Sequence, residues 1–577
     1  MQRTIKTTLL LFVMVSLIPV SSYADDLVEY DWGIYLGSHY TGSVDYYPRA
    51  GEYYRSNFEI RPEVGLNYIG TRNDKMLKVN AFYYDDKRMY LNAEGVGGDT
   101  WSAKLSYRSF FHRTPHDLLE NMTAREAVDP EHNTPGGKTT THQDYVPGAQ
   151  FGYASHQVAS EAILNLIKND ENEVKLYAAH KSIIEHGDKQ VISTSHCFSC
   201  HVESHRAEVD LYTHNFMGGI EGSMGPASLA YEFGYRFTES RVGASQRYFD
   251  EAQHPIQGNK KEEFGSRLIY DDTTLAVEKQ PETEKYSHTA KIKTDLPFGA
   301  LAGSFTHARA TNKDYGLDTK SNGGVARLFS RLSRRISFVG NFSASRIKDD
   351  PYFVDLPLWR EDRPGGGQDF DYTRYSSLTR TYFSGSGEVI YNPSIRYRLS
   401  LLAGYKSNKR DDFPIQDAEY ETETLFGQLT VRYRPSSKFS GSMKARIEQT
   451  DNPFMTVGKL LERRMNGVED PITGNGFVYY FQREDYKYGD ATQLPTMSQQ
   501  LQFQLRYRPA RKWSLVGGLR VQLDKNDDLN TIDFEKTVLQ PSLSTTYVVN
   551  PSWSLYGNFT HLNESLNAPL AVALFDG

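Results

Sequence analysis

The sequence predicts an all-β fold, a large antiparallel transmembrane β-barrel of about 22–28 strands. Aromatic residues make up 13% of the chain, led by 39 Tyr and 30 Phe. Segments of about ten residues alternate polar and apolar side chains, which is the pattern of strands with one face in lipid. The connections alternate between short turns and long polar loops. This predicts short periplasmic turns on one rim and long extracellular loops on the other.

One hairpin pattern recurs along the chain: a strand, an aromatic residue, x-Pro, two or three residues, an aromatic residue and the next strand. It stands at Leu296-Pro297, Asn392-Pro393, Arg434-Pro435, Arg508-Pro509 and Asn550-Pro551. Proline lacks an N–H, so it belongs in the turn and not in the hydrogen-bonded ladder. The flanking aromatics are expected to form an interfacial girdle. Long polar loops are expected at 349–376, 450–496 and about 240–284.

We count about 21 strands between residues 31 and 561. Bacterial single-chain barrels have an even number, so either strands are hidden in 240–284 or the sequence lacks closing strands, which we favour. A barrel of this size has a lumen too wide for its own side chains to fill. It must hold water, a plug or another protein. A stack of soluble β-sandwiches would need domain-sized repeats with linkers, which we do not find.

Residues 1–24 have the features of a secretory signal peptide. Arg3 and Lys6 are basic, residues 9–20 are apolar, and Ser22-Tyr23-Ala24 forms a cleavage site. The apolar stretch is short for a spanning helix. Residues 25–577 are therefore predicted to form a barrel in the lipid bilayer of a bacterial outer membrane. The net charge is −7, with no basic stripe, which argues against a nucleic-acid partner.

Both cysteines of the chain lie in the run His196-Cys197-Phe198-Ser199-Cys200-His201. C-x-x-C followed by His is the attachment pattern of c-type haem. We predict one covalent haem c, with thioethers to Cys197 and Cys200 and with His201 as the proximal iron ligand. A thiol or disulfide redox role is an alternative, although so small a disulfide loop would stabilise little. A zinc site lacks the second pair of ligands that would complete it.

The motif is expected in a haem-bearing loop, 187–206, on the long-loop side of the barrel. Six of the 16 histidines lie nearby: His180, His186, His196, His201, His205 and His214. The distal iron ligand is expected to be His205, His214 or His180. His205 is so close to the motif that reach to the opposite iron face is in question, whereas His214 and His180 could approach from the flanking strands. No catalytic residues are predicted, since no Ser-His-Asp context, phosphate loop or HExxH is present.

The chain resembles the MtrB/PioB-type outer-membrane β-barrels associated with decahaem cytochromes. The likeness rests on Ala93–Asp99 (AEGVGGD) running into Leu105-Ser106-Tyr107-Arg108, on His112-Arg113-Thr114-Pro115, and on the repeated Tyr-x-Pro hairpins. The resemblance implies an insulating sheath that houses a periplasmic multihaem cytochrome and meets an outer-surface multihaem cytochrome. Some members carry CxxC near the mature N-terminus. This chain instead carries CxxCH inside the barrel.

These observations predict a porin-like sheath of a transmembrane electron conduit, a non-enzymatic scaffold for extracellular electron transfer. Hydrocarbon insulates, while a barrel satisfies its backbone hydrogen bonds and leaves room for a chain of haems. One alternative is a diffusion porin or substrate channel with a haem or thiol sensor loop. Another is a haem enzyme or adhesin on a β scaffold.

Overall fold

The structure is a computed structural model, and it describes most of the region predicted to form the barrel. The described residues are 28–41, 59–119, 142–169, 171–194, 202–249, 273–354, 372–374, 376, 378–410, 421–453, 494–527 and 533–568. The predicted signal peptide, 1–24, lies outside them. No helix among the described residues is long and apolar enough to cross a membrane.

The strands of the N-terminal half are bounded as follows: β1 Val28–Thr41, β2 Glu59–Arg72, β3 Lys75–Asp85, β4 Arg88–Gly97, β5 Trp101–Arg113, β6 His142–Asp144, β7 Gly152–Lys168, β8 Asn172–Thr194, β9 Val202–Met224, β10 Ala227–Ser240, β11 Ser245–Phe249, β12 Thr273–Glu278 and β13 Thr283–Leu296. Those of the C-terminal half are β14 Gly299–Asn312, β15 Leu317–Arg331, β16 Ile336–Asp349, β17 Tyr352–Val354, β18 Tyr372–Arg374, β19 Arg380–Ser394, β20 Tyr397–Lys409, β21 Glu421–Tyr433, β22 Phe439–Asp451, β23 Met497–Ala510, β24 Trp513–Asn526, β25 Phe534–Asn550, β26 Trp553–Thr560 and β27 Asn563–Asn567.

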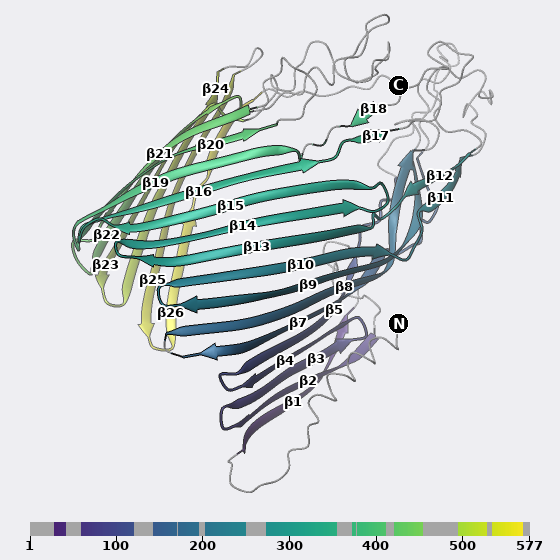
Figure 1. Cartoon of the computed structure of the whole chain (residues 1–577). Coiled ribbons are helices and arrows are strands. Elements are labelled where there is room, and N and C mark those ends of the chain that lie inside the picture. The colour runs from purple at the N-terminus through teal and green to yellow at the C-terminus, as the bar shows by residue number, and fades with distance from the viewer. Residues whose placement is uncertain are drawn as a thin grey trace, which may run out of the picture.

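One 23-stranded sheet contains nearly all of these strands, each of its long strands paired antiparallel with the next along the chain. The short strand β6 adds a parallel pairing to β9, and β26 and β27 both pair with β25. Leaving out β6 and counting β26 with β27 as one, 21 strands of the described region lie side by side, as predicted. Figure 1 shows the sheet curving so that the C-terminal strands turn behind the central ones. Within the described residues no pairing joins β1 to β26 or β27.

The two faces of the sheet differ in chemistry, because successive side chains of a strand alternate and cross-strand partners share a face. On one face Leu401 of β20 pairs with Val389 and Leu429, and its side chain is 60% exposed. On the other face Ser400 pairs with Ile390 and Thr430. The same alternation carries through β21 to β24, where Gln, Arg, Lys and Ser follow the polar face. An apolar outer face and a polar inner face confirm the predicted barrel wall.

The connections differ at the two ends of the strands. At one end, here called the short-turn end, successive strands are joined by turns such as Asn73-Asp74, Gly225-Pro226 and Ile395-Arg396. Asn73 adopts a left-handed conformation with φ 55°, which Asn tolerates better than most residues. Tyr397 and Tyr433 stack beside the x-Pro turns at a centroid separation of 4.4 Å, as predicted for girdle aromatics.

The opposite end, here called the long-loop end, carries additional strands. Two of the segments predicted as loops contain short hairpins: β11 pairs with β12, and β17 with β18. Figure 1 shows both at the same end of the sheet. The sequence prediction missed these strands because each is only a few residues long and interrupted by polar side chains. The β11–β12 hairpin matters most, since it lies against the predicted haem site.

Candidate functional site

The predicted haem ligands Cys197, Cys200 and His201 lie outside the described residues, but the strands that lead to them are described. β8 continues to Thr194 and β9 begins at Val202, and these two residues are paired. Much of the predicted loop 187–206 is therefore strand, and residues 195–201 connect the ends of a hairpin. Pairing persists because 188–194 and 202–208 form a regular ladder with no proline in either segment.

The β8–β9 hairpin extends past its neighbours in the wall. Pairing with β7 ends at Asp188, and pairing with β10 ends at Leu211. Six further residues of β8 run beyond Asp188, which corresponds to about 20 Å of strand. Gly187 lies where β8 leaves the wall, and a Cβ there would be 2.3 Å from the backbone oxygen of Gly152. Glycine thus permits the close backbone approach at this point.

The connection between β5 and β7 braces one side of the projecting hairpin. Its described parts, residues 114–119 and 142–151, are called the strap below. Within the strap, β6 pairs in parallel with the start of β9, joining His142–Asp144 to Val202–Ser204. The N–H of Tyr145 also donates to the backbone oxygen of Ser204 at 3.1 Å. The strap therefore takes the place beside β9 that β10 occupies lower in the wall.

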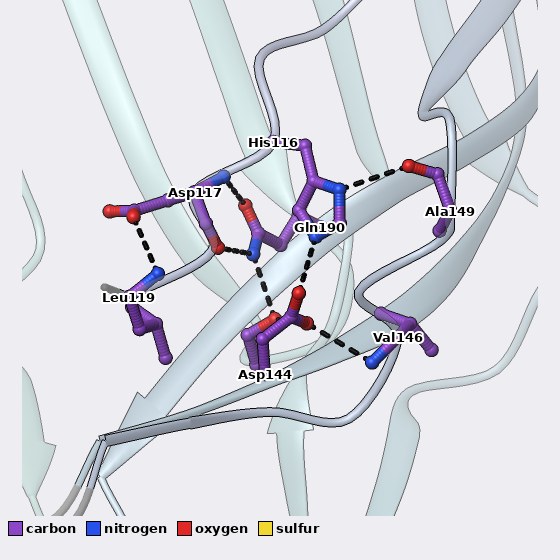
Figure 2. A network of polar contacts seen from close by, with 8 residues as sticks. His116, Asp117, Leu119, Asp144, Val146, Ala149 and Gln190 are labelled. Carbon is purple, nitrogen blue, oxygen red and sulfur yellow. Dashed lines mark hydrogen bonds and ion pairs between the residues drawn. The ribbon is translucent and has the colours of Figure 1, made fainter. Parts of the chain in front are cut away.

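A buried polar network fixes the strap to the hairpin (Figure 2). Asp144 is central: one carboxylate oxygen contacts His116 Nε2 at 2.7 Å, and the other accepts from Ser204 Oγ at 2.7 Å and from the N–H of Val146 at 3.1 Å. His116 Nδ1 lies 2.9 Å from the oxygen of Ala149, so one imidazole joins both limbs of the strap. The side chains of His116 and Asp144 are each 4% exposed.

Gln190 of β8 completes the network. Its amide nitrogen donates to Ser204 Oγ and to the backbone oxygen of Asp117, both at 2.7 Å, and its amide oxygen accepts from the N–H of Asp117 at 2.8 Å. Ser204 is fully buried. Burial alone would raise the pKa of Asp144, but hydrogen bonds from Ser204, Val146 and His116 together hold that pKa below its usual value. The carboxylate is therefore ionised and acts as the acceptor that organises the cluster.

The other side of the hairpin is held by β11 and β12. Arg247 of β11 donates to Ser193 Oγ at 2.7 Å and forms an ion pair with Glu203. Lys189 of β8 pairs with Glu278 of β12. Residues on both strands leading to 195–201 are thus fixed by side-chain contacts from two different connections. Such bracing restrains both strands on either side of residues 195–201.

His205 is the described histidine closest to the motif along the strands, three residues after Val202. Its ring stacks on Tyr145 with centroids 5.0 Å apart. Nε2 is buried, makes no hydrogen bond among the described residues, and lies 3.5 Å from a carboxylate oxygen of Glu203. Burial lowers the pKa of His205, and Asp144 opposes this only in part, so the imidazole is neutral at pH 7. A neutral, half-buried imidazole whose Nε2 makes no hydrogen bond has the properties of an iron ligand.

His180 and His214 lie elsewhere. His180 Nε2 is 3.2 Å from His214 Nδ1, so the two rings contact each other. Both lie on the apolar face, where His214 pairs with Phe237 and His180 with Phe216. Twelve residues separate His214 from Val202, which is about 40 Å of strand. Neither is brought to the motif from the flanking strands, whereas His205 is near it.

The described region holds no group of three or more His, Cys, Asp or Glu side chains arranged for a metal ion. Sequence reasoning missed the residues that brace the site, namely His116, Asp144, Gln190 and Ser204. They belong to four segments, each 14 or more positions from the next, and hydrogen bonds across such separations leave no local pattern. The one available signal was the pair His142-x-Asp144 inside a predicted loop.

His205→Ala is expected to leave covalent haem attached while changing the iron coordination. Loss of an imidazole from the distal side converts six-coordinate, low-spin iron into a five-coordinate or weakly ligated state. Visible and electron paramagnetic resonance spectra of the purified protein measure this change. The double variant His180→Ala, His214→Ala is the matched control and should leave both spectra unaltered. Low-spin spectra that persist in His205→Ala and vanish in the control would reassign the distal ligand.

No protein-family model matches the chain, and no curated protein matches it. Among solved structures, the copper transporter OprC is similar at 8% identity and a TM-score of 0.39, covering 92% of this chain and 75% of that one. BauA, the ferric preacinetobactin receptor from Acinetobacter baumannii, shares 10% identity at a TM-score of 0.37, covering 92% and 74%. Fiu, the ferric-catecholate import receptor from E. coli K12, shares 8% at 0.36, covering 88% and 78%.

Proposed function

We propose that the chain is the outer-membrane sheath of a transmembrane electron conduit and carries one haem c of its own at the long-loop rim. The observation that carries this proposal is the bracing of the β8–β9 hairpin, whose ends lead directly into the C-x-x-C-H motif. A hairpin in an ordinary porin loop would not need side-chain contacts from two other connections to hold it in place. Rigid support on both sides suits a redox group, whose transfer rate depends on fixed separation.

The chain's own residues have defined parts in this proposal. Cys197 and Cys200 would hold the porphyrin through thioethers, and His201 and His205 would bind the iron. A haem held in this way supplies reversible one-electron transfer at a low potential. The wall would contribute insulation, since its apolar face would contact lipid and each long strand between β1 and β26 pairs with a neighbour on both sides.

The width of the wall supports the proposed partners. Its 21 strands are too many for the side chains of the polar face to fill the interior. We propose that a periplasmic multihaem cytochrome occupies the lumen, and that an outer-surface multihaem cytochrome receives electrons near the long-loop end. The chain's haem would stand between them. With the short turns in the periplasm, the β8–β9 hairpin faces outward from the cell.

Reconstitution tests the proposed conduit. The full chain is purified with its bound cytochromes from outer membranes and inserted into liposomes that contain a reduced viologen dye. Addition of an impermeant ferric chelate outside should oxidise the dye at least tenfold faster than in liposomes with the chain alone. A haem-stained band at the barrel's own mass should accompany the activity. Dye oxidation equal in the two preparations would overturn the conduit.

A diffusion porin is the second candidate, and the polar inner face of β20–β24 favours it. Planar-bilayer recordings of the chain without cytochromes distinguish the two functions. A large, steady, weakly selective conductance in the absence of any co-purified cytochrome supports the porin. Conductance that falls when the multihaem cytochrome is added supports the sheath, because the lumen is then occupied.

A further inference from the structure

Charge is divided between two parts of the short-turn rim. The turns that join β15 to β16, β19 to β20, β21 to β22 and β23 to β24 are basic and contain no carboxylate. The cationic residues in or next to these turns are Arg331, Arg334, Arg335, Arg396, Arg434, Lys438, Arg508, Arg511 and Lys512. The turns between β2 and β10 contain Asp74, Asp99 and Glu171, of which Asp99 pairs with Lys168. The basic part of the rim is called the basic arc below.

The basic arc continues up the polar face of the wall. Arg398 of β20 and Arg432 of β21 are direct cross-strand partners. Arg506 of β23 lies on the same face, two residues nearer the turns, opposite Ser440. All three side chains are exposed, and within the described part of the chain none has a carboxylate within 4 Å. Like charges directly opposite each other destabilise a sheet, so this arrangement does not serve the stability of the wall.

The arginines surround a concave site. A hollow of about 1010 Å³ is lined by Arg334 and Arg335, by the turn at Arg396, and by Arg398, Arg432 and Arg506. A second hollow of about 390 Å³ adjoins it on the polar face and includes Lys444 and Arg520. Arg520 Nε is buried and has no hydrogen-bond partner among the described residues. Both hollows are therefore lined by cationic and neutral polar side chains, with no carboxylate among the residues that line them.

Carboxylates on this part of the wall lie farther from the turns. Glu448 pairs with Arg446, and Asp524 accepts hydrogen bonds from Ser498 and Gln522. Toward the turns, the rows that contain Arg398, Lys444 and Arg506 have no acidic member between β20 and β24. Five strands at about 4.8 Å spacing make the cationic surface about 20 Å wide. That width matches a protein surface and greatly exceeds a single small anion.

We propose that the basic arc and the adjoining polar face bind the acidic surface of a soluble protein that enters the lumen from the short-turn end. Lipid phosphates contact the outer face, whereas Arg398, Arg432 and Arg506 lie on the inner face and are separated from lipid by the sheet. The inference deepens the proposed function, on which it rests for the presence of a protein in the lumen. It specifies the charge of the partner's surface and the strands that it contacts.

The test uses the full chain in detergent and a fluorescent poly-L-glutamate of about 50 residues as the acidic probe. The triple variant Arg398→Glu, Arg432→Glu, Arg506→Glu should weaken probe binding by at least about tenfold, and the triple Arg→Lys variant should restore most of it. The matched control is Lys285→Glu, Lys291→Glu, Lys293→Glu, which makes the same charge change on exposed polar-face residues of β13. It should alter binding about twofold or less.

Binding should also fall steeply with salt, because the contacts are between opposite charges. Equal probe affinity in the two charge-reversed variants would overturn the proposal. So would a wild-type chain that binds vesicles of anionic phospholipid or inorganic phosphate but not the probe. Haem staining and dye oxidation do not enter this measurement. A negative result in the probe-binding experiment would therefore reject the docking surface alone, and a negative result in the dye experiment would reject the conduit.

Discussion

The double variant Cys197→Ala, Cys200→Ala is expected to lose all covalent haem while the wall still assembles. Both proposed thioethers would be removed, so no covalent bond to a porphyrin would remain. Haem staining of the denatured chain measures the loss, and resistance of the folded barrel to unfolding in detergent measures assembly. Ser199→Ala changes one of the two residues between the cysteines and is the matched control, which should keep full staining.

Assembly should survive because the sheet does not depend on residues 195–201. β8 and β9 pair from Asn172–Met224 up to Thr194–Val202, and β7 and β10 flank the lower part of that ladder. A variant that lost both haem and barrel would show that the cofactor is needed to form the hairpin. Full staining of the double variant would remove the C-x-x-C-H motif as the attachment site.

Asp144→Ala is expected to release the strap from the β8–β9 hairpin. The substitution leaves His116 Nε2 and the N–H of Val146 buried without acceptors and removes one of two bonds to Ser204 Oγ. Each unsatisfied buried group costs about 1–3 kcal/mol, so local stability should fall by about 3 kcal/mol. Amide hydrogen exchange across 142–151 measures this as a rise of about 100-fold in opening. Asp314→Ala, in the β14–β15 turn, should leave that exchange unchanged.

Acid should loosen the strap in the unsubstituted chain. The folded pKa of Asp144 lies below its ordinary value of 3.8. The stabilisation from its ionised form is therefore complete well above pH 3.8 and is lost as the pH falls through the lower folded value. Exchange across 142–151 should be flat from pH 7 to about pH 5, after correction for intrinsic rates, and should rise below pH 4. Asp144→Ala should lack this transition.

The wall could be predicted from the sequence because its determinants are local. Alternation with a period of two marks each long strand, and x-Pro marks each hairpin, so the tally of about 21 strands agrees with the structure. The short strands β6, β11 and β12 could not be predicted in this way. Each is stabilised by its contact with the β8–β9 hairpin, as where Arg247 pairs with Glu203, and not by a pattern of its own.

For the haem motif, too, the local signal could be recognised in the sequence and the long-range arrangement could not. The spacing of Cys197, Cys200 and His201 is a local signal, and its assignment stays a prediction. The choice among distal histidines depended on how far strand pairing continues, which the sequence did not reveal. A loop of 187–206 would have let His214 fold toward the iron, but β9 runs unbroken from Val202 and separates them. The arginines of the basic arc stood beside the prolines that marked the turns, and their repetition was the available signal for a second surface.

The strap also bears on the order in which the parts of the fold form. The strands of the β8–β9 hairpin meet across a connection of a few residues, whereas Asp144 and Ser204 are 60 positions apart. Contacts between near residues form early, and those that close long stretches of chain form late. The β8–β9 ladder is therefore expected to form before the strap closes against it. Once Asp144 accepts its bonds from Ser204, Val146 and His116, the hairpin is braced, so closure of the strap is expected to be a late step in assembly.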